Sequence, residues 1–257
     1  MRRVKTLASL LLAALLLQGA ALYACAQNKV TARPGEKKQP PPEATEKRAK
    51  TDEDAPSQQS ANDAENPDAP RYFYEFTKAE FVIHHIHIEH DAAGRGRILF
   101  ERRGDTEPIT EPFQLSETAL RRVAGLWTSL NFLDSTADYQ SPKPAPSLGT
   151  TRLRMKRGAR ERTAEFNYSQ DRDAYALANE YRRAAEQVIF VFEIEVAREN
   201  QPLVAPKLLS GLESAIQRNG LSDPQQLLPL LRELSTDERL PLIARNQAVR
   251  LVKKLEK

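Results

Sequence analysis

The chain has 257 residues, of which 40% are hydrophobic and 28% charged, so it is long enough to form one or two domains with a hydrophobic core. Its single cysteine, Cys25, excludes an internal disulfide. The formal net charge is +3, and Arg2, Arg3 and Lys5 account for it, which leaves residues 27–257 with 35 basic and 35 acidic residues. Binding to nucleic acid needs surplus Lys and Arg, so the neutral mature chain argues against a nucleic-acid partner.

Residues 1–26 have the layout of a secretory signal peptide. A basic start precedes an apolar run over Leu7–Leu17, which is too short for a comfortable membrane span. Two cleavage sites compete: a cut after Ala26 releases a secreted protein, whereas Leu22–Cys25 resembles the lipobox of bacterial lipoproteins. That resemblance implies that Cys25 becomes the lipid-modified first residue and the membrane anchor. In both cases we expect export, either to the periplasm and its membrane or fully out of the cell.

Residues 27–70 predict a disordered linker. The segment has seven prolines, many charged residues and no aromatic residue, so it cannot bury enough surface to offset the entropy of ordering. As a flexible chain it has a root-mean-square reach of roughly 35–40 Å. This arrangement suits a membrane tether for the domain that follows, and a solubilising tail is the alternative.

Residues 71–200 predict an α+β domain, because aromatic and β-branched residues become frequent at Arg71. Gly158 and Ala159 fit a two-residue hairpin turn, which would place Arg152 opposite Glu165. Two hairpins are expected, with strands over Phe81–His90, Arg97–Arg103, Thr150–Lys156 and Glu161–Tyr168.

A helix is expected after each hairpin. Ser116 can cap the first helix, in which the apolar spacing buries Trp127. The second begins at Asp171 and extends for about 28 residues by its spacing, although Val188–Val196 has the composition of a strand and leaves a fifth strand as the alternative. The expected fold is therefore a four-stranded antiparallel sheet built as two ββα units, with the helices on one face.

Residues 201–257 predict an all-helical extension, with Gly and Pro at the helix boundaries. Residues 222–256 resemble a single HEAT-type repeat, in which two antiparallel helices carry an acidic residue, here Asp237, in their turn. The resemblance implies a helix pair that stacks on a neighbouring unit. The alternative is an ordinary helix pair that packs on the preceding domain.

All four histidines cluster in one expected strand. By alternation, His85, His87 and Glu89 share one face, whereas His84 and His90 point to the other. Imidazoles two residues apart can bind one metal ion, so these three residues form a candidate site for zinc or another transition metal, with a further carboxylate from elsewhere in the chain completing it. An exposed strand face with no ligand is the alternative.

Motifs of common enzyme classes are missing from the sequence, including the nucleophile elbow, the zinc-protease helix and the P-loop. The interpretation that follows is an exported, membrane-tethered, non-enzymatic binding or structural module of the bacterial envelope, with a protein or cell-wall partner and no cofactor. A metal-binding or metal-dependent exported protein that uses the histidine cluster is the alternative.

Overall fold

The computed structural model describes residues 68–256, which belong to one compact unit. The expected signal peptide, the candidate lipidation site Cys25 and almost all of the expected linker lie outside the described residues. Within the described part, no helix is both long enough and apolar enough to cross a membrane.

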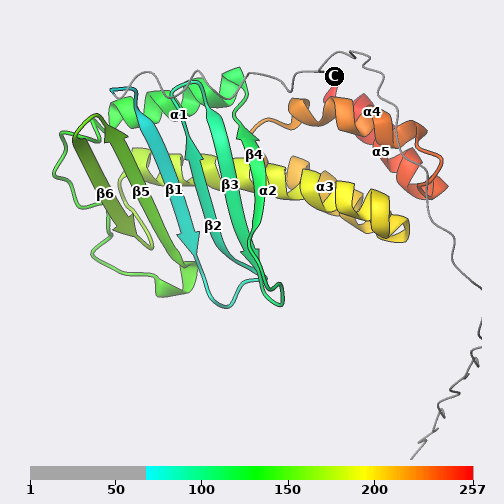
Figure 1. Ribbon diagram of the computed structural model, residues 1–257, viewed down its shortest axis with the longest axis horizontal. Coiled ribbons are helices and arrows are strands. Elements are labelled where there is room, and N and C mark those ends of the chain that lie inside the picture. Colours follow the sequence, from blue (N-terminus) through cyan, green and yellow to red (C-terminus); the bar gives the residue numbers. More distant parts are fainter. Residues whose placement is uncertain (1–67, 257) are drawn as a thin grey trace, which may run out of the picture. The chain divides into compact units, whose positions relative to one another are not determined.

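Six antiparallel strands form one sheet (Figure 1). Their order across the sheet is β4-β3-β2-β1-β5-β6, so the fourth and sixth strands are the edges. The strands are β1 (Arg71–Thr77), β2 (Ile83–His90), β3 (Arg95–Arg102), β4 (Ile109–Gln114), β5 (Thr150–Arg157) and β6 (Arg160–Phe166).

The α+β class is confirmed, but the expectation of four strands in two ββα units is wrong. Strand β1 was missed, although its aromatic residues Tyr74 and Phe76 are buried in the alternating pattern of a strand. Strand β4 was also missed, and its Pro112 is tolerated because an edge strand can lack one N–H. Four strands precede the first helix and two precede the second, and β1 joins the two groups by pairing with both β2 and β5.

Helices α1 (Glu117–Ser129) and α2 (Arg172–Asn200) lie on one face of the sheet (Figure 1). The hydroxyl of Ser116 caps α1 by accepting from the N–H of Ala119, 3.1 Å away, and Trp127 is 3% exposed, as expected. Helix α2 continues without interruption through residues 188–196, so the alternative of a fifth strand there is wrong. Its buried isoleucines, Ile189 and Ile194, belong to two different cores, and this tertiary packing overrides the local strand preference.

The hairpin of β5 and β6 has the predicted register. Arg152 pairs with Glu165 across the strands, and their side chains form an ion pair at 2.8 Å. Gly158 has a φ of 57°, which an L side chain rarely adopts, so the two-residue turn depends on this glycine.

The C-terminal part is helical, as predicted. It contains α3 (Ala205–Gln217), α4 (Leu228–Thr236) and α5 (Leu242–Leu255), with short 3-10 turns at Pro202–Val204 and Pro224–Leu227. These helices bury leucines and alanines in a second core that includes Ile194 from the end of α2. The carboxylate of Asp237 accepts hydrogen bonds from Arg198 and Arg239, which connects the α4–α5 turn to α2. The resemblance to a HEAT-type repeat stays a prediction.

Candidate functional site

The three predicted metal ligands lie on the open face of the sheet, opposite to the face that packs on α1 and α2. His85 and Glu89 are four residues apart on β2, about 13 Å along the strand, which is too far for both to bind one ion at ~2 Å. Among residues 68–256, no group of three or more His, Cys, Asp or Glu side chains is arranged to hold a metal ion. Metal binding by His85, His87 and Glu89 therefore stays a prediction.

The ring of His85 lies between two carboxylates. Its Nδ1 is 3.0 Å from Oε1 of Glu101, and its Nε2 is 3.0 Å from Oε1 of Glu75. An ionised carboxylate only accepts hydrogen bonds, so both ring nitrogens donate when both contacts are made. The hydrogen bond from His85 is also the main reason why the pKa of Glu101 is lowered. In this arrangement His85 has no lone pair left for a metal ion.

His84 does not lie on the face that alternation predicts. The register between β2 and β3 shifts between Ile83 and His85, and Nε2 of His84 is 3.2 Å from Oε2 of Glu101 on the open face. A β-bulge of this kind re-aims a side chain at the point where two residues oppose one. The expectation that His84 points inward with His90 is therefore wrong for His84 and correct for His90.

The carboxylate of Glu89 forms ion pairs with two arginines. It contacts Arg71 and also Nη2 of Arg97, the latter at 3.1 Å. Partial burial alone would raise the pKa of Glu89, but the hydrogen bonds and charges of the two guanidinium groups outweigh burial and lower it. Through these two ion pairs the carboxylate of Glu89 links β2 to β1 and to β3 on the open face.

His90 is the buried member of the cluster, at 1% exposure. Its Nδ1–H donates to the carbonyl of Asp91 at 2.7 Å, and its Nε2 accepts from the hydroxyl of Tyr181 at 2.7 Å. The same hydroxyl accepts from Nε1–H of Trp127 at 2.9 Å. Burial lowers the pKa of His90, so the neutral ring that this chain of hydrogen bonds requires is favoured. These contacts assign His90 to the core.

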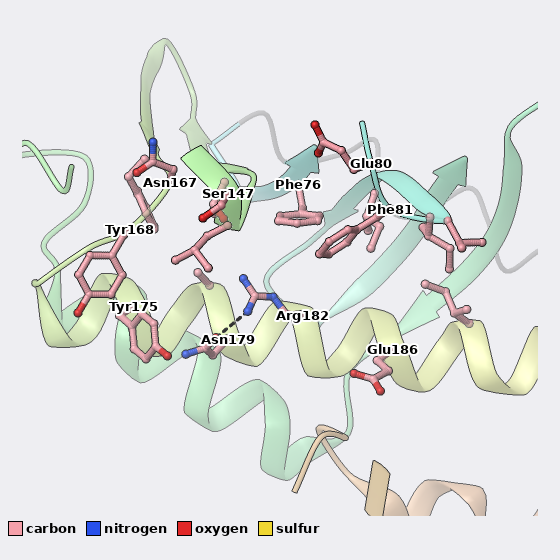
Figure 2. A pocket seen from close by; sticks show the side chains of 18 of the residues that line it. Phe76, Glu80, Phe81, Ser147, Asn167, Tyr168, Tyr175, Asn179, Arg182 and Glu186 are labelled. Carbon is pink, nitrogen blue, oxygen red and sulfur yellow. Dashed lines mark hydrogen bonds between the residues drawn. The ribbon is translucent and has the colours of Figure 1, made fainter. Parts of the chain in front are cut away.

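A groove of about 870 Å³ lies between α2 and the sheet, and we call it the α2 groove (Figure 2). Its walls are the β1 and β2 ends with the loop between them, the 3-10 turn η2 (Pro146–Leu148), the end of β6 and one side of α2. Helix α1 contributes no residue to the lining. The volume is within the range of pockets that bind small ligands.

The lining of the α2 groove is rich in exposed apolar side chains. Of the eleven large hydrophobic residues that are exposed in the described chain, five line it: Phe81, Val82, Leu148, Tyr168 and Tyr175. In Figure 2 the two tyrosines lie toward one end and Phe76 and Phe81 toward the other. Scattered exposed apolar residues are normal, but a contiguous group over a cavity is typical of a binding surface.

Arg182 projects from α2 into the middle of the groove (Figure 2). Its guanidinium lies 5.6 Å from the ring centre of Phe76 and donates to Oδ1 of Asn179 at 3.4 Å. No carboxylate of the described chain forms an ion pair with Arg182. Three glutamates also line the groove, namely Glu80, Glu186 and Glu193, and Glu186 pairs with Arg218. The groove therefore contains one cation, Arg182, that forms no ion pair with the carboxylates of the described chain.

Tyr74 lies behind Arg182 in the core and does not line the groove. Its ring stacks on Tyr181 at 5.2 Å, and its buried hydroxyl makes no hydrogen bond of good geometry within the described residues. Burial raises the pKa of Tyr74 to about 12, and the charge of Arg182 and a hydrogen bond with its guanidinium oppose this rise. Tyr74 is therefore a neighbour of Arg182 and not a second group of the binding surface.

Gly149 positions the loop that forms one wall of the groove. It ends η2 with a φ of 83°, and a Cβ at this position would lie 2.8 Å from the ring of Phe76. Glycine is therefore required both by the backbone conformation and by the close approach to Phe76. This packing holds Leu148 at the groove entrance, where it is half exposed.

The sequence reasoning did not find the α2 groove. Its residues come from distant parts of the chain, and no short motif connects Phe81 with Tyr175. One signal was present in the sequence. The large side chains of Tyr168, Tyr175 and Arg182 lie among smaller polar residues in α2 and in the loop before it. That signal is weak without knowledge of the sheet order.

Comparison with known proteins adds no family assignment to this geometry. No protein-family model matches the chain, and no curated protein has significant sequence similarity to it. The α2 groove and the open sheet face are therefore the features from which function has to be argued.

Proposed function

We propose that this chain is an exported, membrane-tethered, non-enzymatic binding module of the bacterial envelope, and that the α2 groove is its binding site. The observation that carries the proposal is the cluster of five exposed large hydrophobic side chains over one cavity. Covering apolar surface is worth about 25 cal/mol per Å², so an occupant that excludes water from these side chains gains affinity. The partner is an envelope component, of protein or cell-wall origin, that places an apolar portion in the groove.

The N-terminal sequence supports the location in this proposal. An apolar run, the lipobox-like Leu22–Cys25 and a proline-rich segment precede the described domain in that order. Lipidation at Cys25 would anchor the chain, and the spacer would give the groove a reach of several tens of ångströms from the membrane.

The chemistry of the groove supports binding rather than catalysis. Its lining in the described chain has no histidine and no cysteine, the side chains most used as base or nucleophile near neutral pH. Its glutamates are dispersed: Glu186 pairs with Arg218, and burial raises the pKa of Glu193 while the charge of Arg102 opposes the rise.

The proposed binding site can be tested with a neutral apolar fluorophore, N-phenyl-1-naphthylamine, and the purified full chain. We expect its fluorescence to rise on binding, because the groove excludes water. The double variant Val82→Glu with Leu148→Glu should abolish the rise, since two charges would line the groove entrance.

The matched control is Leu242→Glu with Ile243→Glu, which adds the same two charges at equally exposed apolar positions of α5. This variant should retain the signal. Equal loss in both double variants, or an unchanged signal in the groove variant, would contradict the assignment of the binding site to the α2 groove.

The proposed location has its own test. The chain should fractionate with membranes, and Cys25→Ala should release it into the soluble exported fraction. Retention of the variant in the membrane would exclude Cys25 as the anchor, and recovery of the chain from the cytoplasm would exclude export.

A further inference from the structure

Arg182 is the one positively charged residue in the lining of the α2 groove, and several other polar lining groups already have partners. The amide oxygen of Asn167 already accepts from the side chain of Gln140 at 3.1 Å and from the N–H of Ala145 at 2.8 Å. The hydroxyl of Ser169 accepts from a backbone N–H two residues on, at 3.1 Å. These polar groups already have hydrogen-bond partners in the loops around them. Arg182 is the cation of the lining, and it has no ion-pair partner in the described chain.

This distribution favours a hydrocarbon chain over a peptide. A bound peptide brings one N–H and one C=O per residue, and each of them needs a partner when it is buried. The sheet residues that line the groove belong to the interior strands β1, β2 and β5, except for Phe166, the last residue of the edge strand β6. Only one residue of an edge strand therefore reaches the groove, which is too little for a peptide to pair with as an added strand. A hydrocarbon chain needs no such partners.

The positions of the charges define the head group. Arg182 stands in the middle of the groove, between the tyrosine end and the Phe76–Phe81 end (Figure 2). Three glutamates also line the groove: Glu186 is paired with Arg218, burial raises the pKa of Glu193, and Glu80 lies in the loop before Phe81. Arg182 is therefore the one lining position at which an anion meets a positive charge.

From these observations, and resting on the proposed function of the groove, we infer that its ligand is an amphiphile with one hydrocarbon chain and one anionic head group, a long-chain carboxylate being the simplest case. The carboxylate pairs with the guanidinium of Arg182, and the hydrocarbon chain covers the apolar walls that include Phe81 and Leu148. Arg182 is the residue that determines specificity, because it separates an anionic amphiphile from a neutral or cationic one.

Three probes with the same twelve-carbon chain test this inference: dodecanoate, dodecanol and dodecyltrimethylammonium, each below its micelle concentration. Each probe is titrated against the full chain carrying N-phenyl-1-naphthylamine, and displacement of the fluorophore is measured. Dodecanoate should displace it at about a tenfold lower concentration than dodecanol, because a charge-assisted hydrogen bond contributes more than a neutral one. Dodecyltrimethylammonium should be the weakest of the three.

Arg182→Gln should remove the preference for dodecanoate, so that dodecanoate and dodecanol displace the fluorophore at similar concentrations. The control is Arg172→Gln, which removes another arginine of α2 that has no ion pair in the described chain and does not line the groove. That control should keep the tenfold preference. The circular dichroism spectrum and the urea midpoint show whether each variant is folded.

The outcomes separate the inference from the proposed function. Equal displacement by dodecanoate and dodecanol, or a preference that survives Arg182→Gln, would overturn the inference and leave an apolar binding groove. Absence of fluorophore binding to the unmodified chain would contradict both the inference and the proposed function of the groove. Binding to phosphatidylglycerol vesicles that free dodecanoate does not compete with would also overturn the inference, in favour of a membrane surface.

Discussion

The two flanks of α2 face the same side of the same sheet, yet they are built differently. On one flank α1 completes the layer, and Trp127 and Tyr181 fill the space together with His90. On the other flank no second α-helix of residues 68–256 contributes to the lining, and the α2 groove is left with exposed aromatic rings and Arg182.

The two flanks differ in whether their polar side chains have strong hydrogen-bond or ion-pair partners. We call the flank that α1 covers the filled flank. There, each polar atom in the hydrogen-bonded chain of Trp127, Tyr181 and His90 has a partner, so its burial is compatible with stability. In the groove, Arg182 has only a 3.4 Å hydrogen bond to Asn179 and no ion pair within the described chain. The filled flank is therefore expected to control folding, and the groove flank to control binding.

The largest effect is expected when the filled flank is opened. Trp127→Ala removes a side chain that is 3% exposed and leaves a cavity between α1 and α2, so the free energy of unfolding should fall by about 3–5 kcal/mol. Urea denaturation followed by circular dichroism measures it, because Trp127 is the only tryptophan. A loss below about 1 kcal/mol would show that this flank is not the stabilising one.

A smaller loss is expected at the groove wall. Gly149→Ala places a Cβ against the ring of Phe76 at a φ of 83°, and the free energy of unfolding should fall by about 1–3 kcal/mol. Gly104→Ala is the control, because its φ of 97° is equally unfavourable whereas its surroundings are empty. If both variants lose the same amount, the contact with Phe76 contributes nothing.

The filled flank should also be sensitive to acid through His90. Burial lowers the pKa of His90 in the folded state, so between the folded and unfolded pKa values the unfolded chain binds more protons. The free energy of unfolding should therefore decrease as the pH falls below about 6.5, the usual pKa of histidine. His90→Gln should flatten this part of the profile, measured by urea denaturation between pH 7.5 and 5.5. Burial also lowers the pKa of the half-buried His87, so the profile is compared with that of His87→Gln and of the double variant to separate the two contributions. An unchanged slope in His90→Gln would contradict this assignment.

Features that depend on neighbouring residues were predictable from the sequence. The Ser116 cap requires one side chain and the N–H groups of the next turn, and the β5–β6 register follows from a two-residue turn at Gly158. Strands β1 and β4 depend instead on partners that are distant in sequence, which local composition does not identify. The β1 segment could be seen as aromatic-rich, but not that it would join the two hairpins.

The candidate site was harder to predict, for the same reason. Alternation placed His85, His87 and Glu89 on one face correctly. It could not show the bulge at His84 or the arginines that form ion pairs with Glu89. The α2 groove arises because two helices do not cover the whole face of a six-stranded sheet. That mismatch depends on the strand count, and an expected four-stranded sheet would leave little face uncovered.

The smallest effect on stability should be found in the groove, where the effect on binding is larger. Phe81 is 47% exposed, so Phe81→Ser should change the free energy of unfolding by no more than about 0.5 kcal/mol. The same variant should weaken the binding of N-phenyl-1-naphthylamine about fivefold, because roughly 1 kcal/mol of apolar contact is lost at the groove wall. Val249→Ser, on α5 and also partly exposed, is the control and should alter neither quantity. If Phe81→Ser destabilises the fold as strongly as it weakens binding, the two flanks of α2 do not divide folding and binding between them.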